Sequence, residues 1–168
     1  MGIVASAARG ALAGIVATAA MDLVWYRRYR ADGGDQPLLE WEFSSAADRF
    51  DDAPAPARVG RRAAAVVGVD LPDEWAGATN NLVHWMTGIG WGKFAALLAS
   101  VAPVPRPLAG LATGVVAWGT SYAVLPPLGI YEPITSYDRE TLRRDLTAHV
   151  AFGSALGIAL ALLERSDR

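Results

Sequence analysis

Residues 84–92 read HWMTGIGWG and residues 149–157 read HVAFGSALG, so each stretch has the form His-x3-Gly-x3-Gly. A shift of 65 positions places the first stretch on the second, and the match continues from residues 96–98 onto residues 161–163. An α-helix has about 3.6 residues per turn, so residues four apart share a face, and small residues at that spacing are typical of close contacts between membrane helices. The pattern predicts a duplicated helix whose histidines face the interior of a helical bundle rather than lipid.

The composition favours a membrane protein. Hydrophobic residues make up 52% of the 168 residues and charged residues 19%, and the mean hydropathy is +0.23. A bilayer-spanning helix needs about 17 to 25 mostly apolar residues, and four stretches meet this requirement: residues 3–25, 80–101, 108–125 and 146–163. The third stretch has no charged residue, which is unusual for a helix of a soluble protein. We therefore expect a single membrane domain over residues 1–168, with a loop-side insertion at residues 27–79.

A second repeat indicates two tandem helical hairpins. Leu12-Ala13-Gly14 recurs as Leu108-Ala109-Gly110, and Tyr26 recurs as Tyr122, both at an offset of 96. An even number of spans separates equivalent helices, so they run in the same direction, and the two histidines lie at the same depth near the loop-side ends. The sequence predicts an all-α, polytopic four-helix bundle built from two tandem hairpins.

Six polar residues are expected to meet at the loop-side end of this bundle. Two of them end the small-residue stripes of the first and third spans, and two precede the histidines by four residues, which places them on the histidines' own faces. Ionisable groups inside a bilayer are costly, and they mark functional sites. The predicted site comprises His84, His149, Asp22 and Asp145 as ligands or relay groups, with Asn80 and Tyr122 as supporting groups.

Two kinds of ion chemistry suit these side chains. Imidazole and carboxylate together bind divalent metal ions such as zinc, iron, copper or nickel, and neighbouring polar groups orient such ligands. A histidine beside a carboxylate can also titrate near physiological pH and pass a proton to a cavity. We therefore expect a protein that binds or conducts an ion, either a proton or a divalent metal ion. Paired histidines on parallel helices also suit a haem b with two histidine ligands, but the same glycines permit a helix contact that would exclude the porphyrin.

The same residues have a purely structural interpretation. The histidines could donate hydrogen bonds between helices, while Asn80 and Asp145 could cap the starts of their spans. Asp22 could extend to the interface or pair with Arg27 or Arg28. Under this interpretation the protein is a structural or assembly module without ion chemistry.

Other functional classes have no signal in the sequence. The net charge is -2 and basic and aromatic residues are not interleaved, so no nucleic-acid partner is expected. The absence of cysteine excludes disulfides and thiol catalysis. Neither a Gly-x-Ser-x-Gly nor a His-Glu-x2-His motif is present, so no catalytic residue is assigned and an enzyme is not favoured. The expected partner is the lipid bilayer, and additional small-residue stripes, such as Gly10 with Gly14, also permit a homo-oligomer.

The loops give further expectations. Ten arginines lie on the side of the two long loops and four on the opposite side, so the positive-inside rule places the long loops in the cytoplasm. Residues 57–67 are expected to form a short helix that follows a proline and ends at Gly68. The proline-rich residues 126–133 are expected to form a non-helical cap at the same face.

Three segments carry a resemblance to a known family: residues 84–92, residues 118–122 leading to Leu125-Pro126, and residues 145–149 followed by Gly153. In these segments, which cover mainly spans two to four, the chain resembles small bacterial inner-membrane proteins of the YagU-like family. The resemblance implies a polytopic protein of the bacterial inner membrane, and it assigns no catalytic role.

Overall fold

The chain is helical throughout the computed structural model, which describes residues 2–43, 49–101 and 104–165. Four α-helices are long: α1 (Ile3–Ala31), α4 (Ala76–Val101), α5 (Arg106–Val124) and α6 (Arg139–Arg165). The two loops hold the short elements α2 (Leu38–Phe43), α3 (Ala55–Val66), η1 (Asp73–Trp75) and η2 (Ile134–Ser136). These described ranges contain no strand, so the prediction of an all-α fold is confirmed.

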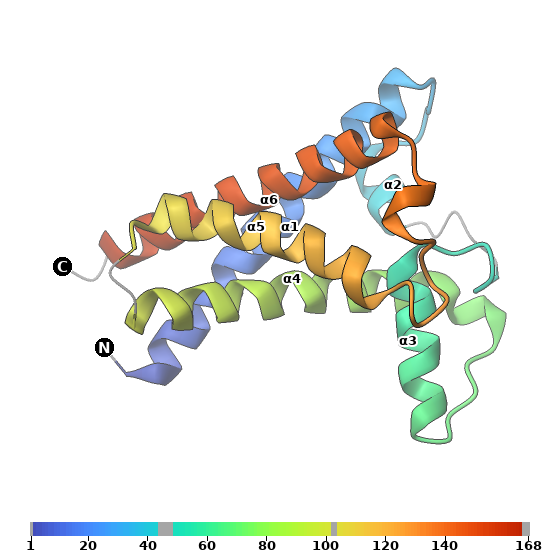
Figure 1. Cartoon of the computed structure of the whole chain (residues 1–168), viewed down its shortest axis with the longest axis horizontal. Coiled ribbons are helices and arrows are strands. Elements are labelled where there is room, and N and C mark those ends of the chain that lie inside the picture. Colours follow the sequence, from blue (N-terminus) through green and yellow to red (C-terminus); the bar gives the residue numbers. More distant parts are fainter. Residues whose placement is uncertain (1, 44–48, 102–103, 166–168) are drawn as a thin grey trace.

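The four long helices run along the longest axis of the molecule (Figure 1). Both chain ends lie at one end of this axis, and the loops with α2 and α3 lie at the other. Helix α1 packs extensively on both α4 and α6, and α5 packs on α6, whereas α4 and α5 make few contacts. The order of packing is therefore α4, α1, α6, α5, with α1 and α6 joining the two hairpins.

Glycines line the interface inside each hairpin. A Cβ atom added to Gly14 of α1 would lie 2.5 Å from the carbonyl oxygen of Gly88 in α4, and one added to Gly153 of α6 would lie 2.6 Å from the carbonyl oxygen of Gly110 in α5. These distances leave no room for a side chain, so glycine is what allows the helices to approach this closely. Gly14 corresponds to Gly110 at the offset of 96, and Gly88 corresponds to Gly153 at the offset of 65. The contact between α1 and α4 and the contact between α5 and α6 are therefore equivalent under the repeat.

The core between the long helices consists mostly of small side chains. Its buried members are Ala13, Ala17, Met21, Ala95, Ala96, Ala148, Phe152, Leu156, Ala159 and Leu160. Alanine and glycine allow close helix packing but enclose little apolar surface. Many of the large aliphatic side chains of these helices consequently lie on the outside of the molecule.

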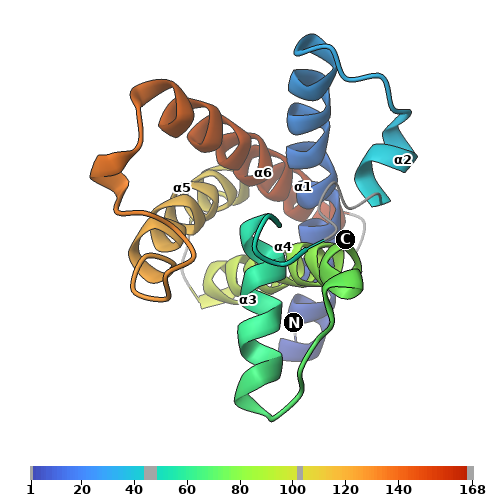
Figure 2. The ribbon, with the colours of Figure 1, turned by 90° about the vertical axis from the view of Figure 1, so that its right-hand side faces the viewer.

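The first loop has a small core of its own. Phe50 is fully buried and packs with Ala53, Ala57 and Ala76, and its backbone N–H donates to Oδ1 of Asp73 at 3.1 Å. Helix α3 packs on α4 and projects across the direction of the long helices (Figure 2). The structure therefore confirms the short helix predicted for residues 57–67, although it begins and ends slightly earlier.

Each predicted span corresponds to a long helix, and α1, α4 and α6 extend further on the loop side than predicted. Helix α6 begins at Arg139 instead of residue 146, and its start is capped by Asp138, whose Oδ1 accepts a hydrogen bond from the Thr141 N–H at 2.8 Å. Asp145 and Asn80 both lie inside helices, so the suggestion that they cap span starts is wrong. An apolarity criterion truncates α1 and α6 because their loop-side turns carry charged residues.

Among the described residues, α1 and α6 are long and apolar enough to cross a membrane. Length and composition thus support membrane crossing for two of the four predicted spans. The proline-rich second loop forms turns at residues 125–129, as expected for a non-helical cap.

Candidate functional site

A cavity of about 830 Å³ lies at the loop-side end of the long helices. Its wall combines residues of all four long helices with residues of the first loop. Five of the six predicted site residues line it: Asp22, Asn80, His84, Asp145 and His149. The sixth, Tyr122, is buried next to Tyr131, which lines the cavity. The prediction that the two histidines lie at the same end of the molecule and face its interior is therefore confirmed.

The first histidine is paired with a carboxylate from another helix. Nε2 of His84 in α4 lies 2.8 Å from Oδ1 of Asp22 in α1, and Asp22 is only 7% exposed. The close contact between Gly14 and Gly88 brings the two helices together deeper in the molecule, which sets the register for this pair. A hydrogen bond of this length that involves a carboxylate belongs to the strong, charge-assisted class.

A second carboxylate, which sequence reasoning did not select, joins this pair. Oε1 of Glu42 in α2 accepts a hydrogen bond from Nε1 of Trp85 at 3.0 Å, and its carboxyl group lies beside that of Asp22. Burial, followed by the negative charge of Asp22, raises the pKa of Glu42 above its ordinary value. Periodicity cannot relate a six-residue loop helix to the spans. The remaining signal in the sequence is an acidic residue between two aromatic ones, Trp41 and Phe43.

The second histidine takes its partner from its own helix. Nδ1 of His149 lies 3.0 Å from the backbone carbonyl oxygen of Asp145 and 3.3 Å from its Oδ1. The repeat explains why the two pairs differ. Trp118 stands where the first hairpin has Asp22, while Asp145 stands where the first hairpin has Asn80. In the first hairpin the carboxylate lies on the neighbouring helix, whereas in the second hairpin it lies on the histidine's own helix.

Tyr122 lies beside the second pair. Its hydroxyl group lies beside the Asp145 carboxylate, and its ring contacts the rings of Trp118, Tyr131 and Tyr137 at centroid distances of 5.4, 5.3 and 5.5 Å. Burial, and next the charge of Asp145, raise the pKa of Tyr131, a cavity residue in the second loop, to about 12. This hydroxyl therefore stays protonated at neutral pH.

The first hairpin has a corresponding aromatic cluster. Tyr26, the equivalent of Tyr122, has its ring 5.4 Å from that of Trp41, and Tyr29 lies 6.0 Å from the same indole. Tyr29 and Trp41 both line the cavity. Each hairpin therefore carries a tyrosine-centred cluster that includes residues of its own loop-side end.

Two arginines of the cavity wall connect the hairpins. Nη1 of Arg28 donates to the backbone carbonyl oxygen of Arg144 at 2.6 Å, and the Arg28 guanidinium lies 4.8 Å from the ring centroid of Trp25. Arg144 in turn forms an ion pair with Asp32 at 2.9 Å. Arg28 thus joins α1 to α6 instead of pairing with Asp22.

The donor atoms form two groups, His84 with Asp22 and Glu42, and His149 with Asp145. Within residues 2–43, 49–101 and 104–165, no three or more histidine, aspartate or glutamate side chains are grouped so that they could hold a metal ion. Both imidazoles nevertheless have a carboxylate within 3.3 Å. As arranged, the site is suited to sharing protons between an acid and an imidazole.

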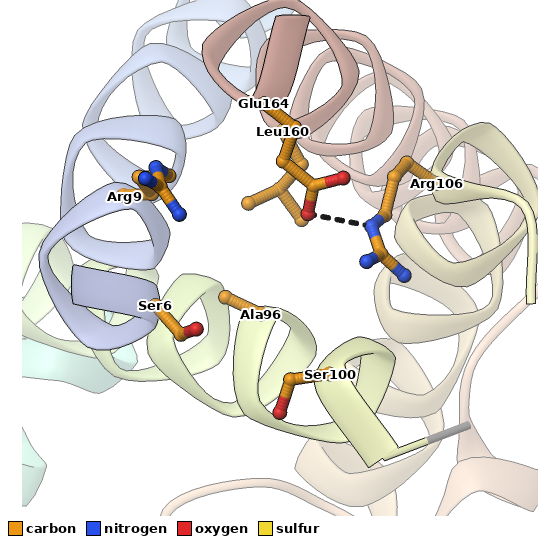
Figure 3. Close-up of a pocket in the computed structure, with 7 residues that line it drawn as sticks. All are labelled: Ser6, Arg9, Ala96, Ser100, Arg106, Leu160 and Glu164. Atoms are coloured by element: carbon orange, nitrogen blue, oxygen red, sulfur yellow. Dashed lines mark hydrogen bonds and ion pairs between the residues drawn. The ribbon is translucent and has the colours of Figure 1, made fainter. Parts of the chain in front are cut away.

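The opposite end of the molecule has a smaller cavity of about 130 Å³ (Figure 3). Nε of Arg106 lies 2.7 Å from Oε1 of Glu164, and Nη1 of Arg106 donates to the Ala99 carbonyl oxygen at 2.6 Å. These contacts tie α4, α5 and α6 together where the hairpins are connected. We assign this cluster a structural role.

No family model, curated protein or solved structure matches the chain. The resemblance to YagU-like proteins therefore stays a prediction, and the function is argued from the geometry of the molecule.

Proposed function

We propose that the chain is an integral membrane protein in which α1, α4, α5 and α6 form a bilayer-spanning four-helix bundle. The proposal is supported by large apolar side chains on the outer faces of all four helices. Examples that are at least half exposed are Leu12, Val16, Met86, Phe94, Leu108, Val116 and Ile158. An apolar surface of this extent is unfavourable in water and is compatible with lipid.

The lengths of the helices are consistent with this placement. Helix α5 is the shortest of the four, and its 19 residues span about 28 Å at a rise of 1.5 Å per residue. The hydrocarbon core of a bilayer is about 30 Å thick. Helix α3 would then lie at the membrane surface on the loop side.

Single cysteines test this topology, because the natural chain has none. Exposed positions at the two ends are Asp70 in the first loop and Val104 between α4 and α5. With the long loops in the cytoplasm, a membrane-impermeant maleimide labels Val104→Cys in intact cells and labels Asp70→Cys only after permeabilisation. The reverse pattern would invert the orientation, and recovery of the protein in the soluble fraction would overturn the membrane placement.

We further propose that the protein binds and passes protons at its two histidine and carboxylate pairs. The observation that carries this proposal is that Asp22 with His84, and Asp145 with His149, line one cavity. Two acid and imidazole pairs on one cavity offer successive positions for a proton.

The charged neighbours of each pair are compatible with this role. Glu42 of α2 lies beside Asp22, and Tyr131 of the second loop lies near Asp145. Arg28 and Arg144 also line the cavity, where they offset part of the negative charge. Each imidazole has a carboxylate within 3.3 Å as a partner for proton exchange.

A divalent metal ion and haem b are the other candidates. Metal binding would require donors from both pairs to converge, and haem would require both imidazoles to meet one iron atom. Elemental analysis and a visible absorption spectrum of the purified protein test both: we expect neither a stoichiometric metal nor a Soret band. Either signal, lost in His84→Ala, would replace the proton hypothesis.

Proton passage is tested in proteoliposomes that carry a pH-sensitive dye inside and an imposed pH gradient. We expect faster proton entry than in protein-free vesicles, and a strong reduction in His84→Ala, Asp22→Asn and His149→Ala. The matched control is Glu140→Gln, which removes a carboxylate at an exposed position outside the cavity. If the histidine variants lose thermal stability but the natural protein shows no proton entry above empty vesicles, the structural-module interpretation is correct.

A further inference from the structure

We infer that the loop-side cavity accommodates an amphipathic amine in its protonated form, which exchanges with the protons of the site. This inference rests on the proposed proton site and names a ligand class for it. It is argued from the size, the lining, the charge and the unpaired acceptors of the cavity.

The cavity has the dimensions and the apolar walls of a small-molecule site. Its volume of about 830 Å³ lies within the range of about 300 to 1,000 Å³ that is typical of pockets for drug-sized ligands. Aromatic side chains occur at several levels of its wall, and they include Trp25, Tyr29, Trp41, Trp91, Tyr131 and Phe152. Aromatic faces attract organic cations, more strongly where water is excluded.

The charge of the wall favours a cation over an anion. Four carboxylates, of Asp22, Asp32, Glu42 and Asp145, face two guanidinium groups, of Arg28 and Arg144. Both guanidinium groups already have partners, since Arg28 bonds to the Arg144 carbonyl and Arg144 to Asp32. With neutral imidazoles the wall therefore keeps an excess of negative charge.

Two buried oxygen atoms indicate that the ligand carries a hydrogen-bond donor. Oδ2 of Asp22 and Oδ1 of Asn80 are buried and have no hydrogen-bond partner in the part of the chain that the structure describes. The Glu42 carboxyl group beside Asp22 can donate to it only when Glu42 is protonated. Asp22 is itself more than nine-tenths buried, and both residues line the cavity. An unsatisfied buried acceptor is unfavourable, and an ammonium N–H would satisfy it. The geometry thus points to an amine with apolar groups, not to a metal ion or a quaternary cation.

Amine binding and proton binding compete for the same carboxylates. A protonated amine beside Asp22 and Glu42 favours the ionised form of Glu42, whose pKa burial raises, whereas protonation of Glu42 removes a charge that attracts the amine. Binding therefore releases protons, and the affinity for the amine rises with pH as long as the amine stays protonated.

A matched series of probes tests the inference on the purified natural protein. Dibenzylammonium has the charge and the N–H donors, dibenzyldimethylammonium has the charge alone, and dibenzyl ether has neither. We expect dibenzylammonium to bind about tenfold or more tightly than the ether, with the quaternary ion between them, because hydrogen bonds to charged groups are strong. Binding is followed by calorimetry at pH 6 and pH 8, with proton release measured in weakly buffered solution. Equal affinity for all three probes, or tighter binding of the anion diphenylacetate, would overturn the inference.

Two variants localise the amine without relying on the probe series. Asp22→Asn should reduce the affinity for dibenzylammonium about tenfold and that for the ether little, whereas Glu140→Gln should change neither. Trp91→Ala removes an aromatic part of the wall and should weaken the binding of both cations. This variant takes the place of Asp22→Asn if Asp22→Asn does not fold. Proton entry without amine, measured on the same preparations, separates the two proposals. Intact proton entry without amine binding would remove only this inference, and pH-dependent amine binding without proton entry would remove only the proton function.

Discussion

Nε2 of His84 lies 2.8 Å from Oδ1 of Asp22, so α1 and α4 share a partly buried hydrogen bond between an imidazole and a carboxylate. His149, the equivalent of His84 in the second hairpin, lacks this partner because Trp118 replaces Asp22. The pair therefore distinguishes the two hairpins.

The coupling between these two side chains is measurable by a double-mutant cycle. We expect Asp22→Ala and His84→Ala each to destabilise the protein, and the double variant to lose less than the sum, with a coupling free energy of about 1 kcal/mol or more. Thermal unfolding in detergent, followed by circular dichroism, measures the three variants. Glu140 and Arg143 form an exposed pair, and their cycle serves as the control with little coupling. Independent effects of Asp22 and His84 would show that the bond has no energetic role.

The glycine interfaces give a contrast within one helix. Gly88→Ala should destabilise the protein by about 1 to 3 kcal/mol, because the added methyl group meets the side chain of Thr18 in α1. Gly90→Ala, two residues away, meets nothing within 4 Å and should stabilise α4 by about 0.5 to 1 kcal/mol. Thermal unfolding of the two variants measures this difference in stability. Similar destabilisation by both would contradict the observed packing of α4 on α1.

Glu42 should make stability depend on pH in one direction. Its folded-state pKa lies above the ordinary value of 4.5, so its contribution to stability is fully present below that pH and is lost as the pH rises through the folded-state pKa. Glu42→Gln keeps the shape and cannot ionise, so its melting temperature should fall less between pH 5 and pH 8 than that of the natural protein. A melting-temperature difference that does not change with pH would contradict the assigned burial of Glu42.

Asp138 should make stability depend on pH in the opposite direction. The hydrogen bonds from Thr141 hold the pKa of this exposed carboxyl below its ordinary value of 3.8, so its contribution is present above that pH and is lost as the pH falls through the lowered value. Asp138→Ala should therefore lower the melting temperature at neutral pH and should have less effect in strong acid.

The same variant tests where α6 begins. Asp138→Ala should speed amide hydrogen exchange in the first turn after residue 138, while Asp138→Asn should preserve protection because asparagine is also a good helix cap. Unchanged exchange in Asp138→Ala would show that the helix starts elsewhere.

The sequence alone determined the helical fold, the duplication and the glycine contacts. These features follow from spacing along a helix: residues four apart share a face, and two copies of one pattern produce two alike interfaces. The common depth of His84 and His149 followed from the repeat as well, since equivalent helices of a tandem repeat run in the same direction.

The tertiary structure decided which groups meet. The sequence placed Asp22 at the level of His84 and Asn80 on its face, and the packing of α1 on α4 decided that Asp22 contacts the imidazole. Glu42 reached the same site through a loop helix whose orientation depends on contacts far away in the chain, which periodicity cannot encode. Capping and contacts with α1 keep the charged first turns of α6 helical. Hydropathy alone assigns such residues to a loop.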